Sequence, residues 1–183
     1  MTTTSYYGEI SKELTEKIKN IKLLVCDIDG VFSDGRIYLG NEGEELKAFH
    51  TKDGFGIKAL VASGVKVAVI TGRQSNIVKN RMNALNVTHI IQGQENKLPA
   101  LEQLATTLDL SFKQMAYIGD DIPDLGCIDA VGLGVAVQDA HPQIIQRANY
   151  VTSLRGGFGA VRELCDVIMQ CQNTITNASG ASV

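Results

Sequence analysis

Two acidic side chains, Asp27 and Asp29, come directly after a short apolar run in the segment LLVCDIDGVFSDG, residues 23–35. Successive side chains of a strand point to opposite faces, so residues two apart are expected to project the same way. Neighbouring carboxylates repel each other, and a cation or a proton is therefore the expected missing partner. The alternative is that these acids only form a turn, because Asp and Gly are ordinary turn residues.

Other groups able to do chemistry follow later apolar runs. The segment TGR, residues 71–73, follows KVAVI, the segment GDDIPD, residues 119–124, follows MAYI, and Lys97 opens a predicted helix. Each is a common loop or helix start when taken alone. In an open parallel sheet, however, ligands bind outside the carboxyl ends of the strands. We therefore expect these groups to meet Asp27 and Asp29 at one edge of a sheet.

Short apolar runs alternate with amphipathic stretches along most of the chain. Strands are predicted at 21–26, 66–70, 87–91, 115–118, 131–137 and 149–152. Helices are predicted at 10–19, 54–63, 75–85, 97–108, 122–129, 141–147 and 159–172. Repeated strand–helix alternation predicts an α/β fold, a Rossmann-like doubly wound parallel sheet covered by helices on both faces.

Residues 35–50 break this alternation and predict a β-hairpin inserted after the first strand. A turn over residues 40–43 would place Ile37, Tyr38 and Leu39 opposite Leu46, Ala48 and Phe49. The final residues, 173–183, are small and polar, and we expect them to form a flexible tail. Residues 1–172 are then expected to form a single domain.

Composition excludes several classes of protein. The chain has 183 residues, 44% of them hydrophobic, and a net charge of -3 without a basic stripe, which argues against nucleic acid as a partner. The polar start and the lack of a long apolar run predict a protein without a membrane segment or secretion signal, in the cytoplasm. The four cysteines, Cys26, Cys127, Cys165 and Cys171, have no metal-type spacing and are predicted to be free thiols.

The segments DIDGV, VITGR and GDDIPD, with Lys97, resemble the four motifs of the haloacid dehalogenase superfamily of phosphotransferases, over about residues 23–137. The resemblance implies that Asp27 is a nucleophile forming an aspartyl-phosphate and that Asp29 is the general acid and base. Thr71 and Lys97 would stabilise the transferring phosphoryl group. The implied cofactor is Mg²⁺, held by Asp27, the backbone carbonyl of Asp29, and Asp120, with Asp121 and Asp124 in supporting positions.

The distances between the motifs leave no room for a cap domain, so a capless enzyme is expected. Residues 29–58, 70–78 and 135–142 resemble the capless phosphatases that act on 3-deoxy-D-manno-octulosonate (Kdo) 8-phosphate in lipopolysaccharide synthesis. This resemblance implies a phosphorylated sugar acid as substrate and a homotetramer in which neighbouring subunits cover each active site. The implied substrate contacts are Asp29, His50, Thr51, Lys52, Asp53, Gly54, Lys58, Arg73, Arg81 and Lys97.

Some alternatives stay open at this level. A nine-carbon sugar-acid 9-phosphate is the rival substrate, and the roles of His50 and Phe158 are not assigned. A receiver-like signalling module also accepts phosphate on an Asp, but its acceptor ends the third strand, where this chain reads HIIQGQENK, residues 89–97. The remaining alternative is an inactive binding module of the same fold. A phosphate-release assay separates these classes.

Overall fold

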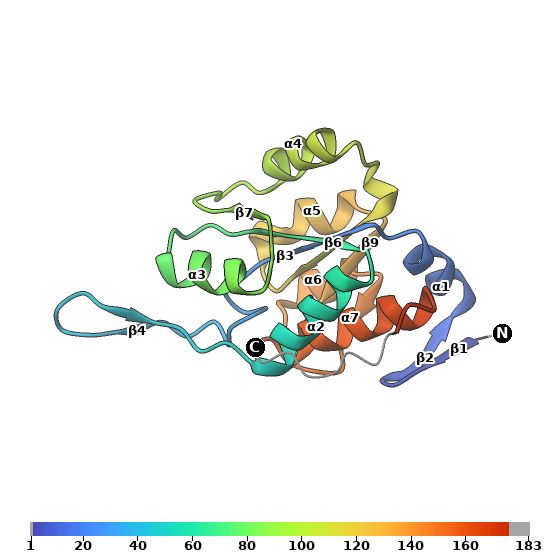
Figure 1. Ribbon diagram of the computed structural model, residues 1–183, viewed down its shortest axis with the longest axis horizontal. Helices are drawn as coiled ribbons and strands as arrows, with labels where there is room; N and C mark the ends of the chain where they lie inside the picture. The colour runs from blue at the N-terminus through green and yellow to red at the C-terminus, as the bar shows by residue number, and fades with distance from the viewer. Residues whose placement is uncertain (1, 176–183) are drawn as a thin grey trace.

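A six-stranded parallel sheet lies at the centre of the computed structural model, which describes residues 2–175 (Figure 1). The strand order is β10, β9, β8, β3, β6, β7. The strands are β3 (Leu23–Cys26), β6 (Lys66–Ile70), β7 (His89–Ile91), β8 (Met115–Gly119), β9 (Leu133–Ala136) and β10 (Tyr150–Val151). From β3 the chain adds β6 and then β7 on one side, and afterwards adds β8, β9 and β10 on the other side. This order confirms the predicted doubly wound sheet.

Helices cover the sheet on both sides, as predicted. Residues 2–175 form the α-helices α1 (Lys12–Lys19), α2 (Thr51–Ala62), α3 (Asn76–Ala84), α4 (Leu98–Leu108), α5 (Leu125–Ala130), α6 (Pro142–Arg147) and α7 (Ala160–Cys171). In Figure 1, α4 and α5 lie above the sheet and α2 and α7 lie below it. All four residues of β3 are buried, because a strand covered on both faces has no solvent side.

Two short 3₁₀ helices, Phe112–Gln114 and Ile122–Asp124, supplement the α-helices. The helix predicted at 122–129 is therefore divided, and its α-helical part begins only at Leu125. Asp121 is the N-cap of the second 3₁₀ helix, where its side chain accepts a hydrogen bond from the Ile122 backbone N–H at 2.8 Å. Pro123 then occupies the first turn, where a missing N–H has little cost.

An N-terminal hairpin is the element that the sequence analysis missed. Strands β1 (Thr2–Ser5) and β2 (Gly8–Ser11) pair in antiparallel fashion, so the helix predicted from residue 10 begins at Lys12 instead. The hairpin is held by α7, where the Tyr7 hydroxyl donates to Asp166 at 2.9 Å. A contact between residues 159 positions apart leaves no local pattern in the sequence.

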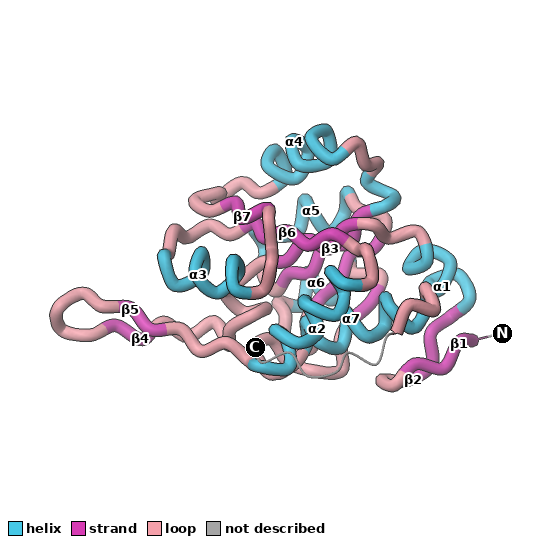
Figure 2. Tube along the Cα trace, in the orientation of Figure 1, coloured by secondary structure: helices cyan, strands magenta, loops and turns pink. Residues whose placement is uncertain are grey.

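The predicted hairpin after the first strand is present, but its ladder is short. Strands β4 (Tyr38–Leu39) and β5 (Glu45–Leu46) pair Tyr38 with Leu46 and Leu39 with Glu45. Ala48 and Phe49 were predicted to lie opposite residues 37–39, but they fall outside this ladder. Figure 2 shows the hairpin projecting from the body of the molecule as an arm. Side chains of Tyr38, Leu39 and Leu46 are exposed on it.

No cap domain interrupts the described chain between the motifs. Only the arm and α2 separate β3 from β6, and only α3 separates β6 from β7. The four cysteines are free and buried, as predicted. Within residues 2–175, no helix is long and apolar enough to cross a membrane. The predicted tail lies outside the described residues from position 176 onward.

Glu163, in the first turn of α7, ties the end of the sheet to this helix. Its side chain is completely buried and accepts hydrogen bonds from the Tyr150 hydroxyl at 2.7 Å and the Ser153 backbone N–H at 2.8 Å. Its second oxygen accepts from the Leu154 backbone N–H at 3.0 Å. Three donors therefore depend on one buried carboxylate.

Replacing this carboxylate tests its contribution to stability. Glu163→Ala should lower the free energy of unfolding by about 3–5 kcal/mol, because three donors would lose an acceptor that is completely buried. Glu163→Gln keeps one acceptor oxygen and should lose roughly half as much. Urea unfolding measures both. Glu102→Ala, at an exposed position on α4, is the control and should stay within about 0.5 kcal/mol of wild type. Equal unfolding midpoints for Glu163→Ala and the control would contradict this role of Glu163.

Candidate active site

The carboxyl ends of β3, β6 and β8 lie level with one another. Cys26, the last residue of β3, pairs with Val69 on one side and Ile118 on the other. The residues that follow these strands therefore leave the sheet at the same edge. A cavity of about 580 Å³ opens there. It is lined by Asp27, Asp29, Gly35, Thr71, Gly72, Arg73, Gln94, Glu95, Lys97, Asp120, Asp121, Pro123 and Asp124.

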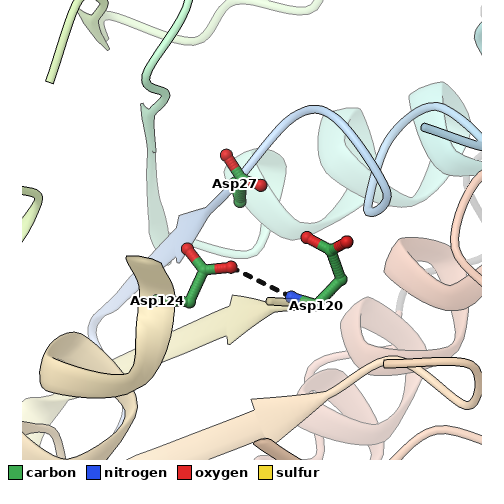
Figure 3. A group of neighbouring side chains, drawn as sticks. All are labelled: Asp27, Asp120 and Asp124. Carbon is green, nitrogen blue, oxygen red and sulfur yellow. Dashed lines mark hydrogen bonds between the residues drawn. The ribbon is translucent and has the colours of Figure 1, made fainter. Parts of the chain in front are cut away.

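Three carboxylates gather at the base of this cavity. One oxygen each from Asp27, Asp120 and Asp124 lies within 4.8 Å of the others (Figure 3). Lys97, at the start of α4, places its Nζ 2.7 Å from both Asp27 and Asp124. Among the described residues no ion pair joins Asp120 to a basic side chain. Three negative charges thus face one positive charge, which leaves room for a divalent cation.

The pKa values of these groups reflect the imbalance. Burial, with the charge of Asp124, raises the pKa of Asp27 to about 6, although the nearby Lys97 ammonium opposes the shift. Burial and the charges of Asp27 and Asp124 raise the pKa of Asp120 to about 8. Burial by itself lowers the pKa of Lys97, but the two facing carboxylates outweigh it and leave that pKa raised. Lys97 is therefore charged. The raised pKa values of Asp27 and Asp120 reflect too little positive charge around these two carboxyl groups.

Asp124 organises the cluster, since both of its oxygens are already used. Oδ1 accepts from Lys97 and from the Tyr117 hydroxyl, each at 2.7 Å. Oδ2 accepts from the backbone N–H groups of Asp120 at 3.0 Å and Asp121 at 3.2 Å. Asp124 is thus bound in the supporting manner that the resemblance implied. Tyr117 is a site residue that the sequence analysis missed, because its apolar strand gives no sign of where the hydroxyl points.

The remaining oxygen donors suit Mg²⁺, a hard cation that prefers carboxylates, backbone carbonyls and water. Asp27 and Asp120 have oxygens beside the cavity, and a third carboxylate holds them in place. Gly30 allows this approach, because its φ is +91° and a Cβ there would lie 2.1 Å from an Asp120 carboxylate oxygen. The observed residues therefore fit a divalent cation at the predicted position.

Asp29 also lines the cavity, but its carboxylate has a different partner. The Lys47 ammonium contacts Asp29 and lies 3.3 Å from Glu45. Glu45 in turn accepts a hydrogen bond from Arg73 at 2.8 Å. Lys47 and Glu45 were absent from the sequence-based set of site residues. Finding them would have required knowing that the arm returns, after residue 43, to the carboxyl end of β3. A sequence pattern does not show that path.

Several predicted substrate contacts do not line the cavity: His50, Thr51, Lys52, Asp53, Gly54, Lys58 and Arg81. His50 is the N-cap of α2, where its Nδ1 accepts from the Lys52 backbone N–H at 3.1 Å. The Arg81 guanidinium lies on Gly54, since a Cβ at Gly54 would be 2.4 Å from Arg81 Nη2. Their substrate role stays a prediction, whereas predicted contacts Asp29, Arg73 and Lys97 do line the cavity.

Asp53 is buried between α2 and α7. Its Oδ1 accepts from the Arg162 backbone N–H at 2.8 Å, in the first turn of α7. Burial raises the pKa of Asp53 to about 6, with backbone donors from Arg162 and Gly159 opposing the shift. In the described chain this carboxyl therefore acts as a cap that joins the two helices.

Comparison with known proteins gives this geometry a family. Residues 86–157 match the family model of haloacid dehalogenase-like hydrolases. A 3-deoxy-D-manno-octulosonate 8-phosphate phosphatase of Yersinia pestis is 48% identical, with 100% of each chain covered. The phosphatase of Escherichia coli K12 is 49% identical over 97% of this chain and 94% of its own.

Solved structures agree with these sequence relatives. A crystal structure of the Yersinia pestis phosphatase has a TM-score of 0.96 at 48% identity and covers 100% of this chain and 99% of its own. The phosphatase of Moraxella catarrhalis, solved with magnesium, phosphate and Kdo, has a TM-score of 0.86 at 45% identity, covering 87% and 91%. The chain therefore belongs to the haloacid dehalogenase-like hydrolases, in the family of the 3-deoxy-D-manno-octulosonate 8-phosphate phosphatases.

Proposed function

We propose that this chain hydrolyses Kdo 8-phosphate to Kdo and inorganic phosphate, a step of lipopolysaccharide synthesis, and uses Mg²⁺. The observation that carries the proposal is the pair Asp27 and Asp29 at one cavity, with Lys97 2.7 Å from Asp27. Relatives 48% identical over the whole chain carry this activity in their names. Residues 1–172 would act as one phosphatase domain.

In the first half of the reaction, a carboxylate oxygen of Asp27 attacks phosphorus and the bond to the sugar oxygen breaks. Asp29 gives a proton to that oxygen, so the sugar leaves as an alcohol. The Thr71 side chain and Lys97 lie beside the cavity, where they can hold the phosphoryl oxygens. The product of this half is an aspartyl-phosphate at Asp27.

In the second half, Asp29 takes a proton from water and the water oxygen attacks phosphorus. The bond to Asp27 breaks, phosphate leaves, and the Asp27 carboxylate is restored. Asp27, Asp120 and the backbone carbonyl of Asp29 would hold Mg²⁺, which when bound offsets the repulsion between carboxylates and phosphate. Lys97 keeps Asp27 and Asp124 in place throughout, because it is bonded to both.

Arg73 supports a substrate that carries a carboxylate as well as a phosphate. Its side chain is 46% exposed at the wall of the cavity, and a guanidinium binds planar carboxylates through two parallel hydrogen bonds. In the described structure the Arg73 guanidinium donates a hydrogen bond to the Glu45 carboxylate. The geometry of Arg73 is thus compatible with binding a carboxylate. Sugar acids are therefore favoured over neutral sugars.

Substitution of the two acids tests the mechanism. Asp27→Asn should abolish detectable turnover, because the nucleophile is lost. Asp29→Asn should lower kcat by about 10²–10⁴, because the leaving oxygen would depart without a proton. The loss for Asp29→Asn should be smaller with p-nitrophenyl phosphate, whose leaving group needs little protonation. Normal turnover by purified Asp27→Asn would exclude a covalent intermediate on this residue.

A substrate panel tests the specificity. The kcat/KM for phosphate release should be at least about tenfold higher for Kdo 8-phosphate than for a nine-carbon sugar-acid 9-phosphate, a hexose phosphate or a nucleotide. That ratio corresponds to about 1.4 kcal/mol of transition-state binding. Chelation should stop release, and added Mg²⁺ should restore it. Equal rates across the panel would refute the Kdo assignment while keeping the phosphatase. No release from any member, with Mg²⁺ present, would favour a binding module.

The arm supports a homotetramer in which neighbouring subunits cover the active sites. Leu39 and Leu46 are 71% and 65% exposed on a two-stranded ribbon, which is only marginally stable in water by itself. The cavity has no cap within the described chain, although an aspartyl-phosphate enzyme must restrict water. Packing of arms between subunits would meet both needs. A cytoplasmic location is part of the proposal and agrees with four free thiols.

A charged arm tests this assembly. Tyr38→Asp with Leu39→Asp should dissociate the tetramer, because the apolar contact would bury two charges. It should also raise KM or lower kcat, although every cavity-lining residue remains. Sedimentation and kinetics on the same sample measure both effects. Lys113→Asp, in the 3₁₀ helix Phe112–Gln114 and away from the cavity lining, is the charge-change control. A fully active monomer would show that a neighbour does not complete the site.

A further inference from the structure

The arm places a buried ammonium beside the general acid of the site. Lys47 follows β5, and its side chain is completely buried, with 0% exposed. Its Nζ contacts Asp29 Oδ1 and lies 3.3 Å from Glu45 Oε1. Neither the motifs of the sequence nor the mechanism above uses this lysine.

Burial of Lys47 is not explained by the stability of the arm. An ammonium is costly to remove from water, and a lysine on an exposed ribbon normally keeps its head in solvent along a flexible stem. The ladder of the arm is only two residues long on each strand, and its pairing does not require a buried charge. The inward direction of Lys47 therefore points to a task at Asp29.

Asp29 depends on Lys47 for its orientation. Its side chain is 22% exposed and borders the cavity, so solvent and substrate can reach it. Within residues 2–175, no other side chain is hydrogen-bonded to the Asp29 carboxylate. Asp27, in contrast, is held by Lys97 at 2.7 Å. Each of the two acids thus has its own lysine, one from α4 and one from the arm.

The contacts of Lys47 link two residues that line the cavity, Asp29 and Arg73. Glu45, on β5, lies between Lys47 and Arg73, and Arg73 donates to it at 2.8 Å. Arg73 belongs to the loop after β6. The base of the arm is therefore joined to both sides of the site through alternating charges: Asp29, Lys47, Glu45 and Arg73.

We propose that Lys47 is a positioning residue for Asp29, fixing the direction in which this carboxyl faces the leaving-group oxygen. The inference rests on the proposed phosphatase function and adds a residue to it. Because Lys47 is carried by the arm, the position of the arm sets the position of the acid. The arm then has a role in the chemistry in addition to any role in assembly.

Substitutions at position 47 test the proposal. Lys47→Met should lower kcat for Kdo 8-phosphate about 10- to 100-fold, because a small misplacement of a catalytic group is costly. KM should stay within about twofold, since binding of the ground state is retained. Lys47→Arg keeps a cation and should recover part of the loss. Lys19→Met is the control, because Lys19 pairs with Glu16 at 2.8 Å on α1, and wild-type activity is expected. Unchanged kcat in folded Lys47→Met would overturn the proposal.

A leaving-group comparison separates positioning from a general structural effect. If Lys47 acts through Asp29, Lys47→Met should raise the kcat ratio of p-nitrophenyl phosphate to phenyl phosphate, as Asp29→Asn does. A fold defect would lower both rates equally and leave that ratio unchanged, which would overturn the proposal. Thermal unfolding of each variant shows which are folded, and Lys47→Gln replaces Lys47→Met if the latter is not.

A double-mutant cycle completes the test. In the Asp29→Asn background, Lys47→Met should change kcat less than about twofold, because the group it positions is gone. The same loss in both backgrounds would mean that Lys47 acts directly on the phosphate, contrary to the inference. If Asp29→Asn by itself has wild-type kcat, the acid–base assignment of the proposed function fails instead. The two failures are thus distinguishable.

Discussion

The bonds of Lys97 to Asp27 and Asp124 are the interaction on which the site depends. They bring the start of α4 to the ends of β3 and β8, although the three residues are far apart in the chain. Without an ammonium beside them, the buried carboxylates of Asp27 and Asp124 and the partly buried carboxylate of Asp120 would repel one another still more strongly at this distance. Lys97 offsets only part of that charge. The remaining negative charge is the physical reason why the site suits a divalent cation.

The arm supplies a second set of charges to the same cavity. Lys47 and Glu45 connect Asp29 to Arg73, and these last two residues line the cavity together with Lys97. A capless enzyme has no separate domain that can orient a general acid or close over a substrate. In this chain a hairpin of two-residue strands takes that position. The outer part of this hairpin leaves the apolar side chains of Tyr38, Leu39 and Leu46 exposed.

The parts of the structure that were predicted correctly are those that depend on local sequence patterns. Buried runs such as residues 66–70 and 115–118 gave the strands, and the acids that follow them marked the carboxyl edge of the sheet. The errors lie where distant residues decide. The N-terminal hairpin, for example, is held against α7 by the hydrogen bond from Tyr7 to Asp166, 159 positions away in the chain.

The sequence by itself determined the α/β fold and the expectation that Asp27, Asp29, Thr71, Lys97 and Asp120 meet at one edge of the sheet, where they line one cavity, because strand period and strand ends are local properties. Only the tertiary structure decided what those groups contact. It placed Asp53 between two helices, turned Tyr117 toward Asp124, and buried Lys47 against Asp29. These outcomes depend on which side chains meet after the chain has folded. The sequence around a charged residue on a hairpin does not show whether its side chain faces solvent or another side chain.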